Sequence, residues 1–297
     1  MSPRTLRGLT LLLVFALAFL ACGDEPESAP ESAEPLSCVV GSFALKKLSL
    51  PEASGAAWVS GALGDGWLVV ADHGNEGRAV HVSPDGAESA ELELPLDMGA
   101  GDDLEGLAWS PQGRLVGLTS AGYLRQWSLE VHPPQLAQLA QAISDDGEWI
   151  CGAQENNCGP NWEGLCLDPE PAPGGCAGFA VSKTLGELVC LRESGAGFSL
   201  DPAVRIEVTK EGRLSGCDYE LVAPHRLIVA GNDKSQNAFW EVLDSRTPED
   251  AEVEKLKIEG TLNQEAVAFG PEGRILSFGD EETITGEGSA IVSFTCL

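Results

Sequence analysis

The sequence is poor in basic residues and in histidine. Its 297 residues include 18 Lys and Arg against 46 Asp and Glu, with only four His, for a formal net charge of −28. Such a charge disfavours nucleic acids and anionic lipid surfaces as partners, because both are polyanions. It favours bound cations, although most of these acidic side chains are expected only to keep the surface soluble.

The sequence also lacks the motifs of several common enzyme and metal sites. It contains no Gly-x-Ser-x-Gly nucleophile elbow, no glycine-rich phosphate loop and no EF-hand loop. No Cys-x-x-Cys pair occurs, and no histidine lies near the cysteines at 151–176, which argues against zinc there. A triad of Ser54, His73 and Asp72 can be drawn, but adjacent residues in a strand point to opposite faces. No catalytic residue is therefore assigned.

The N-terminus has no apolar run long enough to span a bilayer. Two arginines precede ten apolar residues, 11–20, as in the hydrophobic region of a signal peptide. This run ends in Phe19-Leu20-Ala21-Cys22, which resembles a bacterial lipobox, with Phe where Leu is usual. We expect residues 1–21 to be a lipoprotein signal peptide and Cys22 to carry the lipid. The alternative is an ordinary signal peptide that leaves Cys22 as a spare thiol.

The segment after the lipobox has no basic residue. Residues 23–37 hold five acids and three prolines, and they offer too little apolar surface to offset the entropy of ordering. Residues 22–37 are therefore predicted to be a lipidated cysteine with a disordered acidic tether. The whole chain is expected in the bacterial cell envelope as a monomer, attached through the lipid alone. The outer membrane is favoured over the inner membrane.

A five-residue pattern recurs along the rest of the chain, with steps of 51, 58, 52 and 50 residues between copies. A period of this size indicates a repeat architecture. Each copy leads into short alternating apolar runs separated by turn residues, which predicts strands. Residues 38–297 are therefore predicted to form one all-β domain, a five-bladed β-propeller, with six blades as the alternative. The copies are Ser54-Gly55-Ala56-Ala57-Trp58, Glu105-Gly106-Leu107-Ala108-Trp109, Glu163-Gly164-Leu165-Cys166-Leu167, Ser215-Gly216-Cys217-Asp218-Tyr219 and Glu265-Ala266-Val267-Ala268-Phe269.

The last repeat has only three expected strands, and the missing fourth is available at 38–45. Pairing the two ends of the domain in one blade closes the ring. If Cys22 carries lipid, eight cysteines remain, an even number that indicates four disulfides in an exported protein. Ring closure predicts Cys38–Cys296. Sequence proximity suggests the other pairs, Cys151–Cys158, Cys166–Cys176 and Cys190–Cys217.

Two segments fit the repeat poorly. The run at 135–143 has the spacing of either a weak strand or a helical turn. The region 144–177 holds four cysteines and several prolines and is expected to be a disulfide-pinned insertion around the third blade. The seven tryptophans lie mostly at strand positions and are expected in the core between blades.

Several short motifs recur or stand out along the chain: Ser-Gly-x-Ala from Ser54, Asp-x-Glu-Gly-Leu-Ala from Asp103, Gln-Glu-Ala-Val-Ala-Phe from Gln264, and the segments 179–183, 227–233 and 271–281. They resemble the motifs of the SdiA-regulated propeller family and of the phytase-like propellers described by "esterase-like activity of phytase". The likeness covers most of 50–297, and the region 144–177 departs from it. The resemblance implies an exported or membrane-anchored propeller that in some members binds metal, and it supports fold far better than function.

The repeat position predicts a site on the propeller axis. Because the first two strands of a blade are antiparallel, the start of the first lies beside the end of the second. Acidic side chains at the starts of the first strands and at the ends of the second strands should therefore meet around one end of the axis, which we call the rim. They should repel one another unless a cation or Lys183 neutralises them. The alternatives are a solvated ring of acids, or glutamates that bind neighbouring blades and fix their register. The candidate Ca²⁺ ligands are Glu105, Glu163, Glu265, Asp72, Asp233 and Glu281, with Ser54, Ser215, Lys183 and His73 as further ligand-binding residues.

Two classes of function follow from this rim. One is a non-catalytic module that binds a cation, a small ligand or an extracytoplasmic protein, which the missing nucleophile favours. The other is a Ca²⁺-dependent phosphoesterase or esterase, in which metal activates water, a rim glutamate acts as base and Lys183 binds an anionic substrate. Ca²⁺ is the only cofactor expected in either case.

Overall fold

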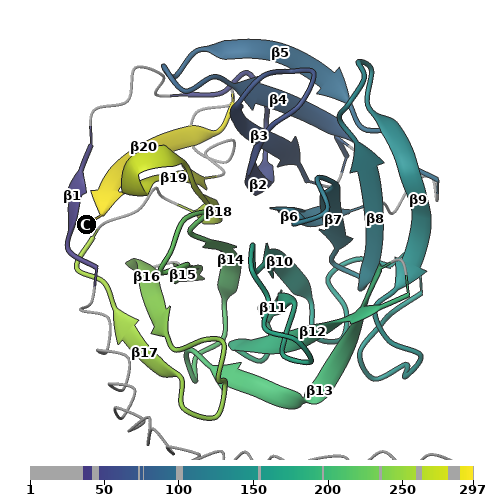
Figure 1. Cartoon of the computed structure of the whole chain (residues 1–297), viewed down its shortest axis with the longest axis vertical. Helices are drawn as coiled ribbons and strands as arrows, with labels where there is room; N and C mark the ends of the chain where they lie inside the picture. Colours follow the sequence, from purple (N-terminus) through teal and green to yellow (C-terminus); the bar gives the residue numbers. More distant parts are fainter. Residues whose placement is uncertain are drawn as a thin grey trace, which may run out of the picture. The chain divides into compact units, whose positions relative to one another are not determined.

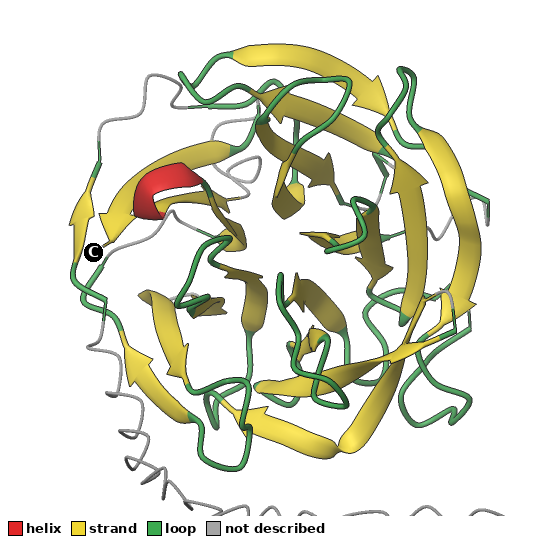
Figure 2. Ribbon diagram, in the orientation of Figure 1, coloured by secondary structure: helices red, strands yellow, loops and turns green. Residues whose placement is uncertain are grey.

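The computed structural model describes residues 36–41, 47–72, 74–75, 77–97, 103–152, 155–195, 197–233, 236–258, 263–279 and 288–296. This part of the chain forms five four-stranded antiparallel sheets around a central axis (Figure 1), the five-bladed β-propeller expected from the repeats. Its one helical segment is the short 3-10 turn η1, Pro271–Gly273 (Figure 2). None of the described residues forms a helix long and apolar enough to cross a membrane. The predicted signal peptide and Cys22 lie outside the described residues.

Each blade runs from an inner strand at the axis to an outer strand at the periphery (Figure 1). The weak run at 135–143 is an outer strand and not a helical turn. The strands are, for blade 1, β2 (Ala53–Val59), β3 (Gly66–Ala71), β4 (Arg78–Val82) and β5 (Glu88–Glu93); for blade 2, β6 (Leu104–Trp109), β7 (Leu115–Thr119), β8 (Tyr123–Ser128) and β9 (Gln135–Ala142); for blade 3, β10 (Trp162–Leu167), β11 (Gly178–Ser182), β12 (Glu187–Ser194) and β13 (Gly197–Glu207); for blade 4, β14 (Leu214–Tyr219), β15 (Leu227–Asp233), β16 (Gln236–Leu243) and β17 (Glu252–Lys255); and for blade 5, β18 (Gln264–Phe269), β19 (Arg274–Gly279), β20 (Ala290–Cys296) and β1 (Cys38–Val40).

The two ends of the domain close the ring, as predicted. Strand β1 is the outer strand of blade 5 and pairs antiparallel with β20, which puts Cys38 opposite Cys296. The two cysteines form a disulfide across a sequence separation of 258 residues. Strand β1 ends at Val40, earlier than expected, although the next residue, Gly41, still donates its N–H to Ser293 O at 2.7 Å.

The hydrophobic core is divided into five clusters, each packed between two neighbouring blades. All seven tryptophans pack in or against these clusters. Trp67, Trp127 and Trp162 are fully buried, and each indole N–H donates to a backbone carbonyl, as a buried tryptophan requires. The acceptor for Trp67 is Phe269 O in blade 5, so this side chain fixes blade 1 against its neighbour.

Every inner strand has a β-bulge at the repeat position. A bulge inserts one unpaired residue into a strand and redirects its side chain. The ladder between the first and second strands skips one residue in each blade, and the skipped residues are Ser54, Glu105, Glu163, Ser215 and Glu265. The first residue of the repeated sequence pattern is therefore the bulged residue of the inner strand in every blade, at the propeller axis.

The small residue after each bulge reflects the close approach of the inner strands. A Cβ atom on Gly106 would lie 2.5 Å from the backbone nitrogen of Leu165 in the next blade. One on Gly164 would lie 2.9 Å from the Cα atom of Gly216. Blade 5 has Ala266 at this position. Glycine in the sequence pattern thus allows neighbouring backbones to meet at the axis.

We expect Gly106→Ala to lower the free energy of unfolding by about 1–3 kcal/mol, because the new methyl group overlaps backbone that cannot move aside. Gly216→Ala is the matched control, since its Cβ would meet no atom closer than 3.3 Å. Urea unfolding of the two variants measures the difference. Equal losses in both would contradict the explanation by close approach.

Two of the predicted disulfides are wrong. Cys151–Cys158 forms as expected, but Cys166 pairs with Cys217, and Cys176 pairs with Cys190. Cys166 and Cys217 lie on the inner strands of adjacent blades with Cα atoms 5.5 Å apart, so propeller geometry brings together residues 51 apart in sequence. Sequence proximity could not anticipate this contact, and the remaining two cysteines then pair across blade 3.

The Cys-rich region 144–177 surrounds β10, the inner strand of blade 3. Trp149 and Ile150 pack on the cluster between blades 2 and 3, and the Tyr123 hydroxyl donates to Cys151 O at 3.0 Å. Asp168 accepts two hydrogen bonds, each 2.6 Å, from the Arg246 guanidinium of blade 4. The described residues of this region thus pack and bridge neighbouring blades.

Candidate functional site

The bulged residues meet at one end of the propeller axis, beside the ends of the second strands. Glu105 and Glu163 are buried, with 6% and 2% of their surface exposed, and Glu265 is half-buried. Glu105 lies within electrostatic reach of Glu163, Glu265, Asp72 and Asp103. Four of the six predicted calcium ligands therefore gather here.

The closest group of acids is Asp72, Asp103 and Glu105. Each offers one carboxylate oxygen, and the three oxygens lie within 4.8 Å of one another. Asp103 is fully buried, and its Oδ2 accepts a hydrogen bond from Ser120 Oγ at 2.6 Å. Its Oδ1 has no hydrogen-bond partner among the described residues. Buried polar atoms nearly always have a partner, so this oxygen is available to accept a hydrogen bond from water or to bind an ion.

The environment of Glu105 disfavours the ionised form of its carboxyl group. Burial raises the pKa of its carboxyl well above the ordinary value, and the charges of Glu163, Asp72, Asp103 and Glu265 raise it further. Its side chain has no hydrogen bond or ion pair within the part of the chain described here. A bound cation would stabilise the ionised form of Glu105. Without a cation, the raised pKa means that the carboxyl tends to keep its proton.

Lys183 neutralises the charge of Glu163, away from the Asp72, Asp103 and Glu105 group. Its Nζ lies 2.9 Å from Glu163 Oε1, and Asn161 Nδ2 donates to the same oxygen at 2.8 Å. Burial lowers the pKa of Lys183, but the charges of Glu163 and Glu265 outweigh that effect and hold it above the ordinary value. Lys183 therefore stays charged and is engaged mainly by Glu163.

Glu265 and Ser54 contact neighbouring blades. Asn232 of blade 4 donates to Glu265 Oε1 at 2.6 Å and to Asn263 Oδ1 at 3.0 Å. The Ser54 hydroxyl donates to the backbone oxygen of Leu104 in blade 2. These contacts are of the kind that fixes the register of one blade against the next, so Glu265 and Ser54 are less available to a metal than Asp103 and Glu105.

The remaining predicted site residues are only partly described. Ser215 is fully buried at its bulge, and its hydroxyl has no hydrogen-bond partner among the described residues. Asp233 ends β15, but its side chain lies outside the described part of the structure. His73 and Glu281 also lie outside the described residues.

Several residues that build this site were not chosen from the sequence. Asp103 lies two positions before the repeat glutamate, in the Asp-x-Glu of the second copy. At the same position in other blades, Asn161 and Asn263 adopt left-handed backbone with φ of 49°, which asparagine tolerates better than most residues. The signal was present as a polar residue preceding the repeat by two in every copy.

A small cavity lies among the inner strands at the axis. Its volume is about 10 Å³, and it is lined by two of the bulged residues, Ser54 and Glu105, and by the small residue that follows the bulge in each of the five blades. This is about the space that one water needs.

In chelator, we expect stability to fall as pH rises from about 5 to 7.5. Burial raises the pKa of Glu163 to about 7, despite the opposing effect of Lys183. Between the unfolded value of 4.5 and this folded value, the folded protein keeps a proton that the unfolded chain has lost, so the free energy of unfolding decreases with pH. The change is about 3 kcal/mol. Urea unfolding at the two pH values should show a smaller slope in Glu163→Gln, and an unchanged slope would contradict the assignment.

Comparison with known proteins adds information on the fold. No protein-family model matches the chain, and no curated protein matches it. The catalytic domain of the GH62 α-L-arabinofuranosidase of Coprinopsis cinerea is 9% identical, with a TM-score of 0.58, 88% of this chain covered and 97% of that one. The PQQ-bound aldose sugar dehydrogenase of Streptomyces coelicolor is 15% identical, with a TM-score of 0.51, 90% of this chain covered and 100% of that one.

The chain is a β-propeller. Its own sheet topology shows five blades, and both solved structures share its fold. Identities this low carry no information on activity, substrate or cofactor. The resemblance to SdiA-regulated and phytase-like propellers stays a prediction.

Proposed function

We propose that this propeller is a binding module that holds Ca²⁺ at the mouth of its axis through Asp72, Asp103 and Glu105. The observation that carries the proposal is the buried Asp103 Oδ1, which lacks a partner among the described residues beside two other carboxylates. Calcium binds oxygen at about 2.3–2.6 Å, so ligands on opposite sides of one ion lie about 5 Å apart. The observed limit of 4.8 Å between the three oxygens fits one shared ion.

The type of ligand favours a hard cation. The group consists of three carboxylates, with no histidine or cysteine among them. Thiolate and imidazole ligands select zinc and copper, whereas oxygen ligands suit calcium and magnesium. Calcium accepts irregular geometry and a mixture of protein and water ligands, while magnesium demands a near-ideal octahedron at shorter distances. A strand-end site built from side chains of two blades suits calcium better.

The hydroxyl groups of the rim support binding over nucleophilic catalysis. Ser54 donates to a backbone carbonyl and has no base beside it in the described contacts, and Ser215 is buried at the axis. Within the described part of the chain, no serine of the rim contacts a histidine. A nucleophile needs a base within hydrogen-bond reach, so covalent catalysis has no support here.

A Ca²⁺-dependent esterase or phosphoesterase is the second candidate, and one observation favours it. The pKa of Glu163 is raised to about 7, which suits a general acid or base near neutral pH. Lys183, 2.9 Å away, would bind an anionic substrate. Hydrolysis of p-nitrophenyl acetate and p-nitrophenyl phosphate, with and without Ca²⁺, tests this candidate. Turnover that requires Ca²⁺ and is lost in Glu163→Gln would support it, and no turnover would remove it.

Calorimetric titration of Ca²⁺ into chelator-treated protein tests the binding proposal. We expect one ion per chain in the wild type and none in Asp103→Asn or Glu105→Gln. Glu207→Gln is the matched control, because this glutamate is exposed on the outer strand of blade 3. The proposal fails if no ion binds, or if all three variants bind as the wild type does.

We also propose that Cys22 anchors the propeller to the bacterial envelope. The apolar run at 11–20 and the lipobox-like residues before Cys22 motivate this proposal. Labelled palmitate should enter the wild-type protein expressed in bacteria and should not enter Cys22→Ser. Equal labelling of both would end the lipoprotein proposal, and the propeller would then function without an anchor.

A further inference from the structure

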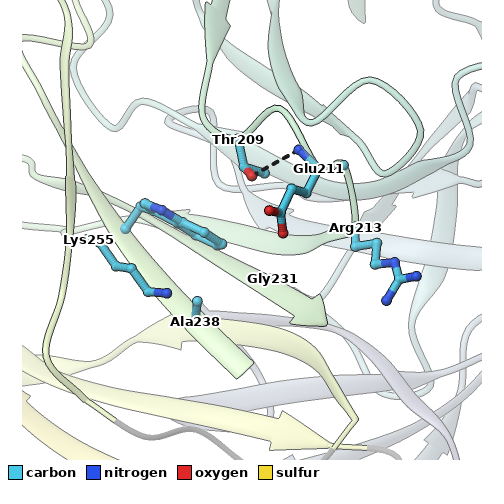
Figure 3. A pocket seen from close by; sticks show the side chains of 8 residues that line it. Thr209, Glu211, Arg213, Gly231, Ala238 and Lys255 are labelled. Carbon is cyan, nitrogen blue, oxygen red and sulfur yellow. Dashed lines mark hydrogen bonds between the residues drawn. The ribbon is translucent and has the colours of Figure 1, made fainter. Parts of the chain in front are cut away.

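We propose that blade 4 carries a second binding site, which takes a sugar with a carboxylate group, a uronic acid. The site is a pocket of about 490 Å³, within the range of small-molecule sites. It stands apart from the calcium proposal, since none of its lining residues belongs to the acidic group at the axis. The lining residues are Thr209, Glu211, Gly212, Arg213, Gly231, Ala238, Trp240 and Lys255 (Figure 3).

The floor of the pocket is one face of blade 4. Trp240 on β16 lies directly opposite Lys255 on β17, so the two side chains project side by side. Gly231 pairs with Ala238 on the neighbouring positions, and these small residues leave a hollow beside the indole. A Cβ atom on Gly231 would lie 2.6 Å from Trp240 Cζ3, so glycine lets the ring lie against the strand. The result is an aromatic surface next to an ammonium group.

The wall of the pocket is the segment 209–213, which connects blade 3 to blade 4. The backbone fixes this segment at both ends, because Thr209 N donates to Gly186 O at 3.1 Å and Arg213 N donates to Lys183 O at 2.6 Å. The Glu211 backbone N–H donates to Thr209 Oγ1 at 3.2 Å, the dashed line in Figure 3. The wall is therefore preformed, which lowers the entropy cost of binding.

The charged groups of the pocket select an anion that also carries hydroxyl groups. The Lys255 side chain has no ion pair or hydrogen bond among the described residues, and its ammonium group points into the pocket (Figure 3). Arg213 also lines the pocket, but it already interacts with another residue and its side chain points away from Lys255 (Figure 3), so the proposal depends on Lys255 as the cation. An ammonium group only donates hydrogen bonds, so it suits a carboxylate.

Glu211 and Trp240 restrict further which anions fit the pocket. The Glu211 carboxylate can accept hydrogen bonds from the hydroxyl groups of a ligand. The Trp240 indole offers an apolar surface for the C–H face of a sugar ring. Inorganic phosphate has no such face, and a multiply charged nucleotide is repelled by a protein of net charge −28. A uronic acid combines one carboxylate, several hydroxyl groups and an apolar ring face.

Titration with D-galacturonate, followed by calorimetry and by intrinsic tryptophan fluorescence, tests the proposal. D-galactose, AMP and inorganic phosphate are titrated in parallel, all in chelator, so the result does not depend on the axial ion. Lys255→Gln should weaken galacturonate binding by at least about tenfold, because it removes a charged hydrogen bond. Lys257→Gln is the matched control, since Lys257 is exposed two residues away and does not line the pocket.

Trp240→Ala supplies a second variant. It should abolish both galacturonate binding and the ligand-dependent fluorescence change, with circular dichroism used to confirm that the variant is folded. The proposal is supported if galacturonate binds more tightly than galactose and the difference disappears in Lys255→Gln but not in Lys257→Gln. It is overturned if galactose binds equally well, if AMP or phosphate binds in place of galacturonate, or if none of the four binds.

Discussion

Millimolar Ca²⁺ should raise the melting temperature of the wild-type protein by about 5–10 °C above its value in chelator. A ligand that binds only the folded state at a concentration of about 100 Kd contributes about 2.7 kcal/mol. For a domain of this size, each kcal/mol shifts the melting temperature by about 2–4 °C. The shift arises because the cation compensates the negative charges of Asp72, Asp103 and Glu105, which otherwise repel one another.

The same melting experiment distinguishes these ligands from the other rim acids. Asp103→Asn combined with Glu105→Gln should abolish the Ca²⁺ shift and raise the melting temperature in chelator, because two buried acids are removed from one cluster. Glu265→Gln should keep most of the shift, since Asn232 already binds that side chain. A double variant that still responds to Ca²⁺, or a wild type with identical curves in chelator and Ca²⁺, would place the rim among solvated acidic surfaces.

Replacing both cysteines of the ring-closing disulfide with alanine should lower the free energy of unfolding by about 5 kcal/mol. In the chain-entropy model, a disulfide stabilises by restricting the unfolded chain, and the effect grows with the length of the closed loop. Cys38 and Cys296 are separated by 258 residues, which is almost the whole domain. Chemical unfolding of Cys38→Ala/Cys296→Ala under oxidising conditions measures the loss.

The disulfide between Cys151 and Cys158 provides the comparison. Its two cysteines are only seven positions apart. The same model therefore predicts that its removal lowers the free energy of unfolding by about 2–3 kcal/mol, about half as much as removal of the ring-closing disulfide. Equal losses in the two double variants would show that loop length is not the source of stabilisation. A ring-closing variant as stable as the wild type would show that the hydrogen bonds between β1 and β20 suffice to close the propeller.

The number of blades could be predicted from the sequence repeat, and the ring closure from the strand that the last repeat lacks. The repeat position recurs every fifty residues or so, and it is the β-bulge of every inner strand. The glycine after it is needed where neighbouring backbones meet. The fourth strand of blade 5 was missing from the C-terminal repeat and present at the N-terminus, so the pairing of β1 with β20 followed.

The details that the sequence could not supply depend on contacts between blades. The Cys166–Cys217 disulfide joins two inner strands, and no local pattern distinguishes it from a bridge within one blade. Asp103 belongs to a motif visible in the sequence, but its complete burial, with an Oδ1 that lacks a partner among the described residues, arises only when blades 1 and 2 are packed. Glu163 and Glu265 share a repeat position with Glu105, yet Lys183 and Asn232 engage them, and those partners come from β-strand ends that differ between blades.

Anomalous diffraction from crystals grown in Ca²⁺ tests the central claim most directly. We expect one ion at the mouth of the axis, with carboxylate oxygens of Asp72, Asp103 and Glu105 at about 2.3–2.6 Å, and with Asp103 Oδ1 among them. An axial mouth without an anomalous peak, in which a water molecule satisfies Asp103 Oδ1, would contradict the account.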